Sequence, residues 1–160
     1  YRDNRITPIY EGTNSVQAAD LVFRKLINRN GDVIDKYINL VREEINIKDE
    51  KAQPFVKQLH YHLGILSKFT DWIKEKIKNS PEDASGACND YLKVLGLVAT
   101  GHAWLKVLEV SFNEYDSNKD FYEDKIQTAN FFYNRILPRI DSNYITATTG
   151  SNYIMNYKFN

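Results

Sequence analysis

Residues 55–79 read FVKQLHYHLGILSKFTDWIKEKIKN, and this stretch decides the fold. Apolar residues and one histidine recur in it at alternating steps of four and three residues, the spacing of one face of an α-helix. These positions are Phe55, Leu59, His62, Leu66, Phe69 and Ile73, with Val56, Leu63 and Ile77 beside them. Asn79-Ser80-Pro81 ends the pattern. The stretch therefore predicts a long helix that buries one face against its neighbours.

Helical spacing also appears on both sides of this stretch. Asn14 or Ser15 is a suitable cap for the first segment, and Asn30-Gly31 is a suitable stop. The predicted segments are residues 16–29, 32–47, 82–112 and 121–137, the last ending just before Pro138. No segment shows the alternation of a strand. We predict an all-α fold, an antiparallel bundle of about four to five helices preceded by an irregular N-terminal segment.

Two features of the predicted bundle concern its packing and its end. The middle of segment 82–112 contains Gly96 and Gly101, each of which costs a helix about 1 kcal/mol relative to alanine, so we expect a neighbouring helix to approach closely there. The small residues are Ala87, Gly96, Ala99, Gly101 and Ala103. Residues 141–160 are rich in Thr, Asn and Tyr, and we expect a tail with one docked helical turn at residues 153–155.

The composition is that of one soluble globular domain. The 160 residues are 42% hydrophobic and 13% aromatic, and 21 basic residues balance 21 acidic ones. Zero net charge argues against a nucleic-acid or anionic-membrane partner. The most apolar stretch, residues 94–105, is shorter than the ~20 residues of a membrane span. A single cysteine cannot form an intramolecular disulfide, and we expect a cytoplasmic protein.

Asp116, Asn118 and Asp120 open like a calcium-binding loop, but the loop is incomplete. The position that requires glycine is Phe121, and the position that requires a bidentate glutamate is Gln127. We therefore interpret this segment as a polar turn that caps the next helix.

The histidines and the cysteine do not form a recognisable metal site. His60 and His62 are two residues apart on a helix, so they point in different directions, and His102 stands alone. We predict no protein-held metal and expect satisfied structural histidines. Cys88 has no nearby base in the sequence, and we expect it to pack in the interior.

Glu11 is the candidate for chemistry. It stands between Tyr10 and Gly12, just before a helix start that offers free N–H groups and a positive dipole. A carboxylate desolvated there by an apolar ligand would have its pKa raised toward the range of a general base. The alternative is a glutamate in a solvated loop.

The opening sequence resembles the signature of the acyl-CoA dehydrogenase family, Arg-Asp-x-Arg-Ile, a spacer, then Ile-Tyr-Glu-Gly-Thr-Asn-x-Ile-Gln. Valine replaces isoleucine at one position, a conservative departure. The matching residues are Arg2, Asp3, Arg5, Ile6, Ile9, Tyr10, Glu11, Gly12, Thr13, Asn14, Val16 and Gln17. Later segments resemble the extra helical C-terminal domain of large bacterial members of the 3-methylmercaptopropionyl-CoA dehydrogenase type. They are Tyr91-Leu92, residues 101–105, Phe121-Tyr122, Lys125, Thr128-Ala129 and Ile136-Leu137-Pro138.

The resemblance implies an FAD-dependent enzyme that introduces an α,β double bond into acyl-CoA thioesters. It implies that Glu11 removes the α-proton and that its backbone N–H, with a ribityl hydroxyl of FAD, holds the thioester oxygen. It places Gly12 against the substrate and Thr13, Asn14 and Ser15 along FAD.

The resemblance also divides the chain. Residues 1–30 would be the end of the catalytic helical domain, and residues 31–160 an accessory helical bundle. Most flavin and CoA contacts would lie before residue 1, so we expect this fragment to be inactive alone and to bind neither FAD nor acyl-CoA tightly. The implied partners are acyl-CoA and an electron-transfer flavoprotein, and we expect a homo-oligomer. The face of Gly96, Ala99 and Ala103 would pack on the catalytic part or on another subunit. An acyl-CoA oxidase and a stand-alone helical interaction module remain alternatives.

Overall fold

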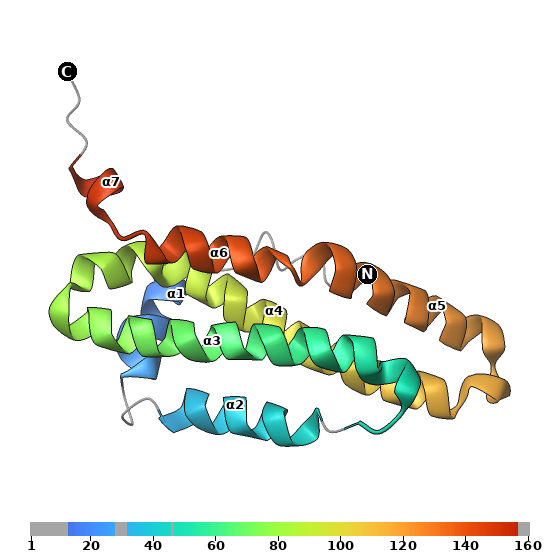
Figure 1. The fold of residues 1–160 in the computed structure, drawn as a ribbon. Coiled ribbons are helices and arrows are strands. Elements are labelled where there is room, and N and C mark those ends of the chain that lie inside the picture. The colour runs from blue at the N-terminus through green and yellow to red at the C-terminus, as the bar shows by residue number, and fades with distance from the viewer. Residues whose placement is uncertain (1–12, 28–31, 46, 157–160) are drawn as a thin grey trace.

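The computed structural model describes residues 13–27, 32–45 and 47–156, and these residues are helical with no strand among them (Figure 1). The all-α prediction is confirmed. The α-helices are α1 (Asn14–Asp20), α2 (Asp32–Glu44), α3 (Gln53–Asn79), α4 (Pro81–Asn113), α5 (Lys119–Phe131), α6 (Arg139–Thr148) and α7 (Asn152–Met155). Short helical turns of other types are η2 (Leu21–Leu26), η3 (Glu50–Ala52), η4 (Tyr115–Ser117) and η5 (Phe132–Ile136).

The two longest helices, α3 and α4, run antiparallel and meet at a tight turn (Figure 1). α2 lies along one side of α3, and α5 followed by α6 forms the opposite edge of the bundle (Figure 1). α4 packs against α1, α3, α5 and α6, so it is the central helix. Its position explains why its sequence carries both large apolar and small residues.

The core forms where the stripe of α3 meets α4. Leu59, Leu66, Phe69 and Ile73 are fully buried, as the spacing of residues 55–79 predicts. Two buried tyrosines add hydrogen bonds. The Tyr91 and Thr70 hydroxyls lie 2.9 Å apart, and the Tyr133 hydroxyl donates a hydrogen bond to the Gly101 carbonyl at 2.8 Å. The buried residues that α4 and η5 contribute to this core are Tyr91, Val98, Leu105, Leu108 and Tyr133. Every buried polar tip in this region is therefore paired.

The expected close approach at small residues occurs at one end of the stripe only. A β-carbon built on Gly101 would lie 3.1 Å from Leu59 Cδ1 and 3.3 Å from Leu137 Cδ1, and Ala87 is fully buried. Gly96, by contrast, has no neighbouring atom within 4 Å of a built β-carbon, and Ala99 and Ala103 are exposed. Close packing explains Gly101 but not Gly96. Packing of the exposed face of Gly96, Ala99 and Ala103 on the catalytic part or on another subunit stays a prediction.

The expected C-terminal tail is the main error of the sequence analysis. Residues 139–148 form α6, which begins directly after Pro138 because a proline is tolerated at a helix start, where its missing N–H is not needed. Ile140 and Ala147 face the core at helical spacing. The helical turn at residues 153–155 exists as α7, but it is not docked, since Tyr153 is 85% exposed.

Two helix boundaries also differ from the prediction. α1 begins after Thr13, not after Asn14 or Ser15, and α2 ends at Glu44 instead of near residue 47. By length and composition alone, α4 is apolar enough to cross a membrane, which the short stretch 94–105 did not indicate. The core helix of a soluble protein meets the same criterion, and four other helices pack on α4, so no membrane span is established.

Candidate functional site

Three of the predicted site residues, Thr13, Asn14 and Ser15, lie at the start of α1. Glu11 and Gly12, expected to be the base and a substrate contact, are outside the described residues. Thr13, Asn14 and Ser15 are described, and all three are exposed. The structure therefore shows the second half of the candidate site.

Thr13 caps α1 with its backbone and not with its side chain. Its carbonyl accepts hydrogen bonds from Val16 N at 2.9 Å and Gln17 N at 3.2 Å. Its hydroxyl makes no capping hydrogen bond, although threonine at this position commonly does. The N–H groups of Asn14 and Ser15, which precede these two donors, have no acceptor within the helix, because every helix begins with such free donors. The start of α1 thus presents a hydroxyl and backbone donors in one place.

Ser15 links the candidate site to the central helix. Its hydroxyl oxygen accepts a hydrogen bond from Asn89 Nδ2 of α4 at 3.2 Å, so its own hydrogen remains available to a further acceptor. Below this contact, Ala18, Val22 and Leu26 are buried, and α1 packs on α4. The site is therefore carried by a helix that is anchored in the core of the bundle.

A turn of π-helix follows α1 and changes the direction of its side chains. η2 spans Leu21–Leu26, where the backbone hydrogen bonds join residues five apart instead of four apart. Asp20 pairs with both Arg24 and Lys25 across this change, and the Arg24 hydrogen bond holds the pKa of Asp20 below its usual value. Nothing in the sequence pattern predicted the π-turn.

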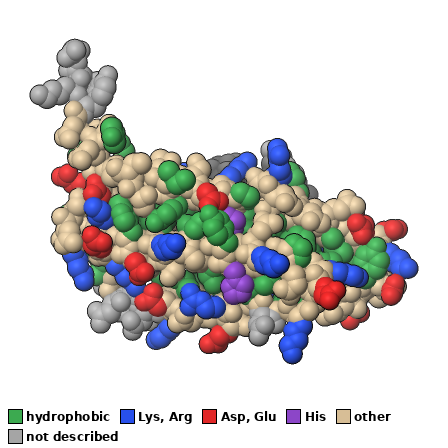
Figure 2. Space-filling view, viewed as in Figure 1, with side chains coloured by type: hydrophobic (Ala, Val, Ile, Leu, Met, Phe, Trp, Pro, Cys, Tyr) green, Lys and Arg blue, Asp and Glu red, His purple; other side chains and the backbone are tan. Residues whose placement is uncertain are grey.

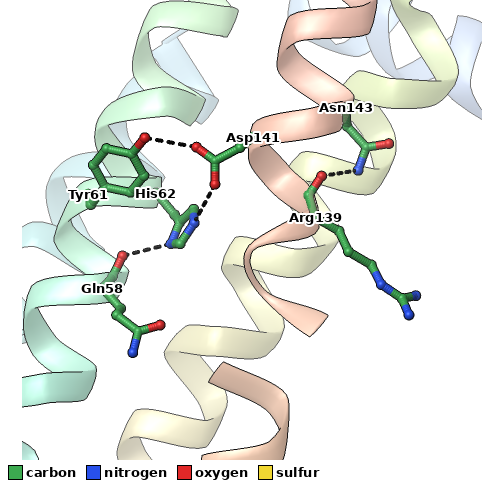
Figure 3. A network of polar contacts seen from close by, with 6 residues as sticks. All are labelled: Gln58, Tyr61, His62, Arg139, Asp141 and Asn143. Atoms are coloured by element: carbon green, nitrogen blue, oxygen red, sulfur yellow. Dashed lines mark hydrogen bonds and ion pairs between the residues drawn. The ribbon is translucent and has the colours of Figure 1, made fainter. Parts of the chain in front are cut away.

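A second polar cluster joins α3 to α6 (Figure 3). Asp141 Oδ1 accepts from the Tyr61 hydroxyl at 2.8 Å, and Asp141 Oδ2 lies 3.3 Å from His62 Nε2. His62 Nδ1 lies 2.8 Å from the Gln58 carbonyl, which can only accept. Both ring nitrogens are thus engaged and His62 is 4% exposed, so it is a satisfied structural histidine as the sequence indicated.

His102 has a comparable role between α2 and α4. Its Nε2 lies 2.9 Å from Glu44 Oε2, and Lys106 Nζ lies 3.3 Å from the same oxygen. The hydrogen bond with Lys106, and to a smaller extent the one with His102, lowers the pKa of Glu44. The contacts of Glu44 with His102 and Lys106 hold the end of α2 against α4. The described residues contain no group of three or more His, Cys, Asp or Glu arranged to hold a metal ion.

The remaining candidates are structural. Asn118 Oδ1 accepts from Phe121 N at 3.4 Å, which confirms that the calcium-like segment is a turn capping α5. Cys88 is buried, as expected, and its thiol donates to the Ala84 carbonyl at 3.2 Å. Burial raises the pKa of this thiol to about 11, so it is held in the unreactive form.

Comparison with known families gives a match over most of the chain. The family model described as "Acetyl-CoA dehydrogenase C-terminal like" matches residues 33–158. The chain belongs to this family. The match covers α2 to α7 and the core that they share with α1, and it does not include Thr13, Asn14 or Ser15.

Two curated relatives agree with the family. The chain is 28% identical over 144 residues to 3-methylmercaptopropionyl-CoA dehydrogenase of Ruegeria pomeroyi, a match covering 86% of this chain and 24% of the relative. It is 24% identical over 168 residues to the broad-specificity linear acyl-CoA dehydrogenase FadE5 of Mycobacterium tuberculosis, covering 96% of this chain and 27% of that protein. The chain thus spans about a quarter of the length of these relatives.

Sequence reasoning missed the long-range partners of the site and of the clusters. Asn89 holds Ser15 from 74 residues away, and Asp141 reaches His62 from 79 residues away. Asp141 lay in the segment predicted to be a tail, so its role could not be seen. For Asn89 the only available signal was its place near the start of a long helix, which does not point to Ser15.

Proposed function

We propose that this chain is the C-terminal part of an FAD-dependent acyl-CoA dehydrogenase. The observation that carries the proposal is the family match over residues 33–158, supported by two acyl-CoA dehydrogenases as relatives. In this proposal residues 1–30 complete the catalytic helical domain, and residues 31–160 are an accessory bundle. The whole protein uses acyl-CoA as substrate and an electron-transfer flavoprotein as acceptor, and it assembles as a homo-oligomer in the cytoplasm.

Glu11 is the proposed base. Its carboxylate takes the α-proton of the thioester, and the electron pair of that C–H bond becomes part of the new α,β double bond. FAD, when bound, would supply the acceptor for the hydride of the β-carbon. The backbone N–H of Glu11 donates to the thioester oxygen, where negative charge develops as the proton leaves. Gly12 allows the substrate to approach the backbone because it has no side chain.

The described part of the site fits the FAD assignment. Thr13 and Ser15 each have a hydroxyl hydrogen that the described contacts leave available, and Asn14 presents an exposed amide beside them. Hydroxyl and amide donors at the positive end of a helix suit the hydroxyl and phosphate groups of a dinucleotide. These three side chains would orient FAD through hydrogen bonds, while the Asn89 contact keeps Ser15 in place.

The test is anaerobic reduction of the flavin in the longer protein that carries this chain, with Glu11→Gln beside Glu75→Gln. Glu75 is an exposed residue of α3 that is no part of the proposed site, so its variant controls for loss of one charge. We expect Glu11→Gln to keep its FAD and to be reduced about 10²- to 10⁴-fold more slowly by a saturated acyl-CoA, the usual contribution of a general base. Glu75→Gln should match the parent.

Three other outcomes would change the assignment. Undiminished reduction in Glu11→Gln would remove Glu11 as the base. Rapid reoxidation of the reduced flavin by air, with hydrogen peroxide formed, would identify an oxidase instead of a dehydrogenase. A longer protein that binds no FAD under any condition would favour a helical interaction module.

A further inference from the structure

A hollow of about 560 Å³ lies between the end of α2 and the beginning of α3, on the side of the bundle away from α6. Its wall is formed by the buried side chains of Ile45, Ile47 and Val56. The other residues that line it are polar or charged, and they are Arg42, Glu43, Lys48, Gln53, Lys57 and His60. The volume lies within the range of roughly 300–1,000 Å³ that is typical of small-molecule sites.

The charge around this hollow is predominantly positive. Arg42, Lys48 and Lys57 line it, and Glu43 is the one carboxylate among the lining residues. Some lysines of the described chain lie beside a carboxylate, among them Lys74 with Asp35 at 2.8 Å, Lys76 with Asp83 at 3.2 Å and Lys106 with Glu44 at 3.3 Å, while others, such as Lys68 and Lys78, do not. Within the described residues, neither Lys48 nor Lys57 forms such a pair. Figure 2, which has the view of Figure 1, shows basic and acidic side chains interspersed over the face that it draws.

Hydrogen bonds fix the backbone that carries these charges. Gln53 Nε2 donates to the Ile47 carbonyl at 2.7 Å and to the Asp49 carbonyl at 3.4 Å, which holds the segment on either side of Lys48. Asp49 Oδ1 in turn accepts from Lys51 N at 2.8 Å. On the opposite wall, the Arg42 side chain itself is held, because its Nη1 donates to Asn39 Oδ1 at 2.9 Å. Lys48 therefore projects from a segment held by hydrogen bonds, and Arg42 and Lys57 project from the helices α2 and α3 on either side of it.

We propose that this hollow binds a small anion whose charge is carried by phosphate groups. Three cations with one carboxylate leave an excess of positive charge, which a multiply charged anion would neutralise. The guanidinium of Arg42 matches two oxygens of one phosphate group, and the ammonium groups of Lys48 and Lys57 act as point charges for the rest. The site is separate from the start of α1, and the proposal stands independently of the proposed dehydrogenase function.

The test is a calorimetric titration of the 160-residue chain with inorganic pyrophosphate at constant ionic strength. The parent is compared with Lys48→Gln/Lys57→Gln and with Lys68→Gln/Lys78→Gln, which removes two exposed lysines of α3 outside the hollow. We expect saturable binding by the parent and the control, and at least tenfold weaker binding by the double variant of the hollow. Circular dichroism should show equal helicity in all three proteins, since every substituted side chain is exposed.

Two further probes define the ligand. Citrate carries a similar charge on carboxylates, and we expect it to bind at least tenfold more weakly than pyrophosphate. ADP carries the same diphosphate on an organic group; tighter binding of ADP would assign the hollow to a phosphorylated metabolite, and tighter binding of pyrophosphate to the inorganic anion. Equal affinity of both double variants for pyrophosphate, the absence of saturable binding, or citrate binding as tight as pyrophosphate would overturn the proposal.

Discussion

Alanine substitutions at two glycines of α4 should have different effects on stability. Gly96 and Gly101 are five residues apart in the same helix, so replacing either one by alanine gains about the same helix propensity, roughly 0.5–1 kcal/mol. A β-carbon at Gly96 meets no atom within 4 Å. Gly96→Ala should therefore raise the free energy of unfolding by about that amount.

At Gly101 the same β-carbon would enter the packed core. It would lie 3.1 Å from Leu59 Cδ1, 3.3 Å from Leu137 Cδ1 and 3.7 Å from Phe132 Cε1. Leu59 and Leu137 are fully buried, so their movement displaces other core side chains. Overpacking of this kind costs about 1–3 kcal/mol. After the gain in propensity, Gly101→Ala should range from neutral to about 2 kcal/mol destabilised, and it should be about 1–3 kcal/mol less stable than Gly96→Ala.

Urea unfolding followed by far-ultraviolet circular dichroism measures this difference, provided that the slope with denaturant is equal in the two variants. Gly101→Val, which adds two further methyl groups at the same place, should be less stable than Gly101→Ala. Equal stabilisation by the two alanine substitutions would refute the packing of α4 against Leu59 and Leu137 described above.

Three further predictions concern buried and paired groups. Hydrogen bonds from the Ser151 backbone and side chain, with smaller contributions from Ser80 and Lys76, hold the pKa of Asp83 well below its usual value. The stabilisation is therefore present above about 3.9, the pKa of an aspartate in the unfolded chain, and it is lost as the pH falls below that value. The melting temperature of the parent should approach that of Asp83→Asn as the pH is lowered from 5 to 2. Tyr91→Phe removes the hydroxyl contact with Thr70, but the hydrogen bond from Thr70 to the Leu66 carbonyl remains. The variant should therefore lower the free energy of unfolding in urea by about 0.5–1.5 kcal/mol, and a loss above about 3 kcal/mol would contradict this account. Burial raises the pKa of the Cys88 thiol to about 11, so Cys88 should not react with a thiol-reactive dye at pH 8 in the folded chain. It should react at once in 6 M urea, and fast reaction in the folded chain would show that the thiol is accessible there.

The parts of the fold that sequence predicted are those in which one helix face carries large apolar residues. The stripe from Phe55 to Ile73 identified α3, and Asn79-Ser80-Pro81 marked its end at the observed residue. α4 was predicted within one residue at each end for the same reason. Burial of these stripes dominates the energy of the bundle, so local pattern and tertiary structure agree there.

The parts that sequence could not predict depend on contacts between distant residues or on weak patterns. α6 has few core residues, Ile140 and Ala147 being the buried ones, in a segment whose Thr, Asn and Tyr content suggested a tail. The π-turns at residues 21–26 and 132–136 have no recognisable sequence signal. At the candidate site, the position of Ser15 depends on Asn89, which no local spacing reveals.

The roles of the candidate site residues came from the signature and not from the helical pattern. Its place in the sequence alone left Glu11 open to two interpretations, a base or a glutamate in a solvated loop. The structure adds that the Thr13 hydroxyl makes no capping hydrogen bond and that Asn89 holds Ser15 in place. The roles of Glu11 and Gly12 and the division at residue 30 stay predictions.

The central claim, that Glu11 removes the α-proton, is tested most directly by proton exchange. An acyl-CoA analogue without hydrogen on its β-carbon cannot lose a hydride, so exchange of its α-hydrogens with D₂O reports proton abstraction alone. The longer protein should exchange them, and Glu11→Gln should do so at least about 100-fold more slowly at equal FAD content, in line with loss of a general base. Exchange at the parent rate in Glu11→Gln would contradict the assignment and place the base elsewhere.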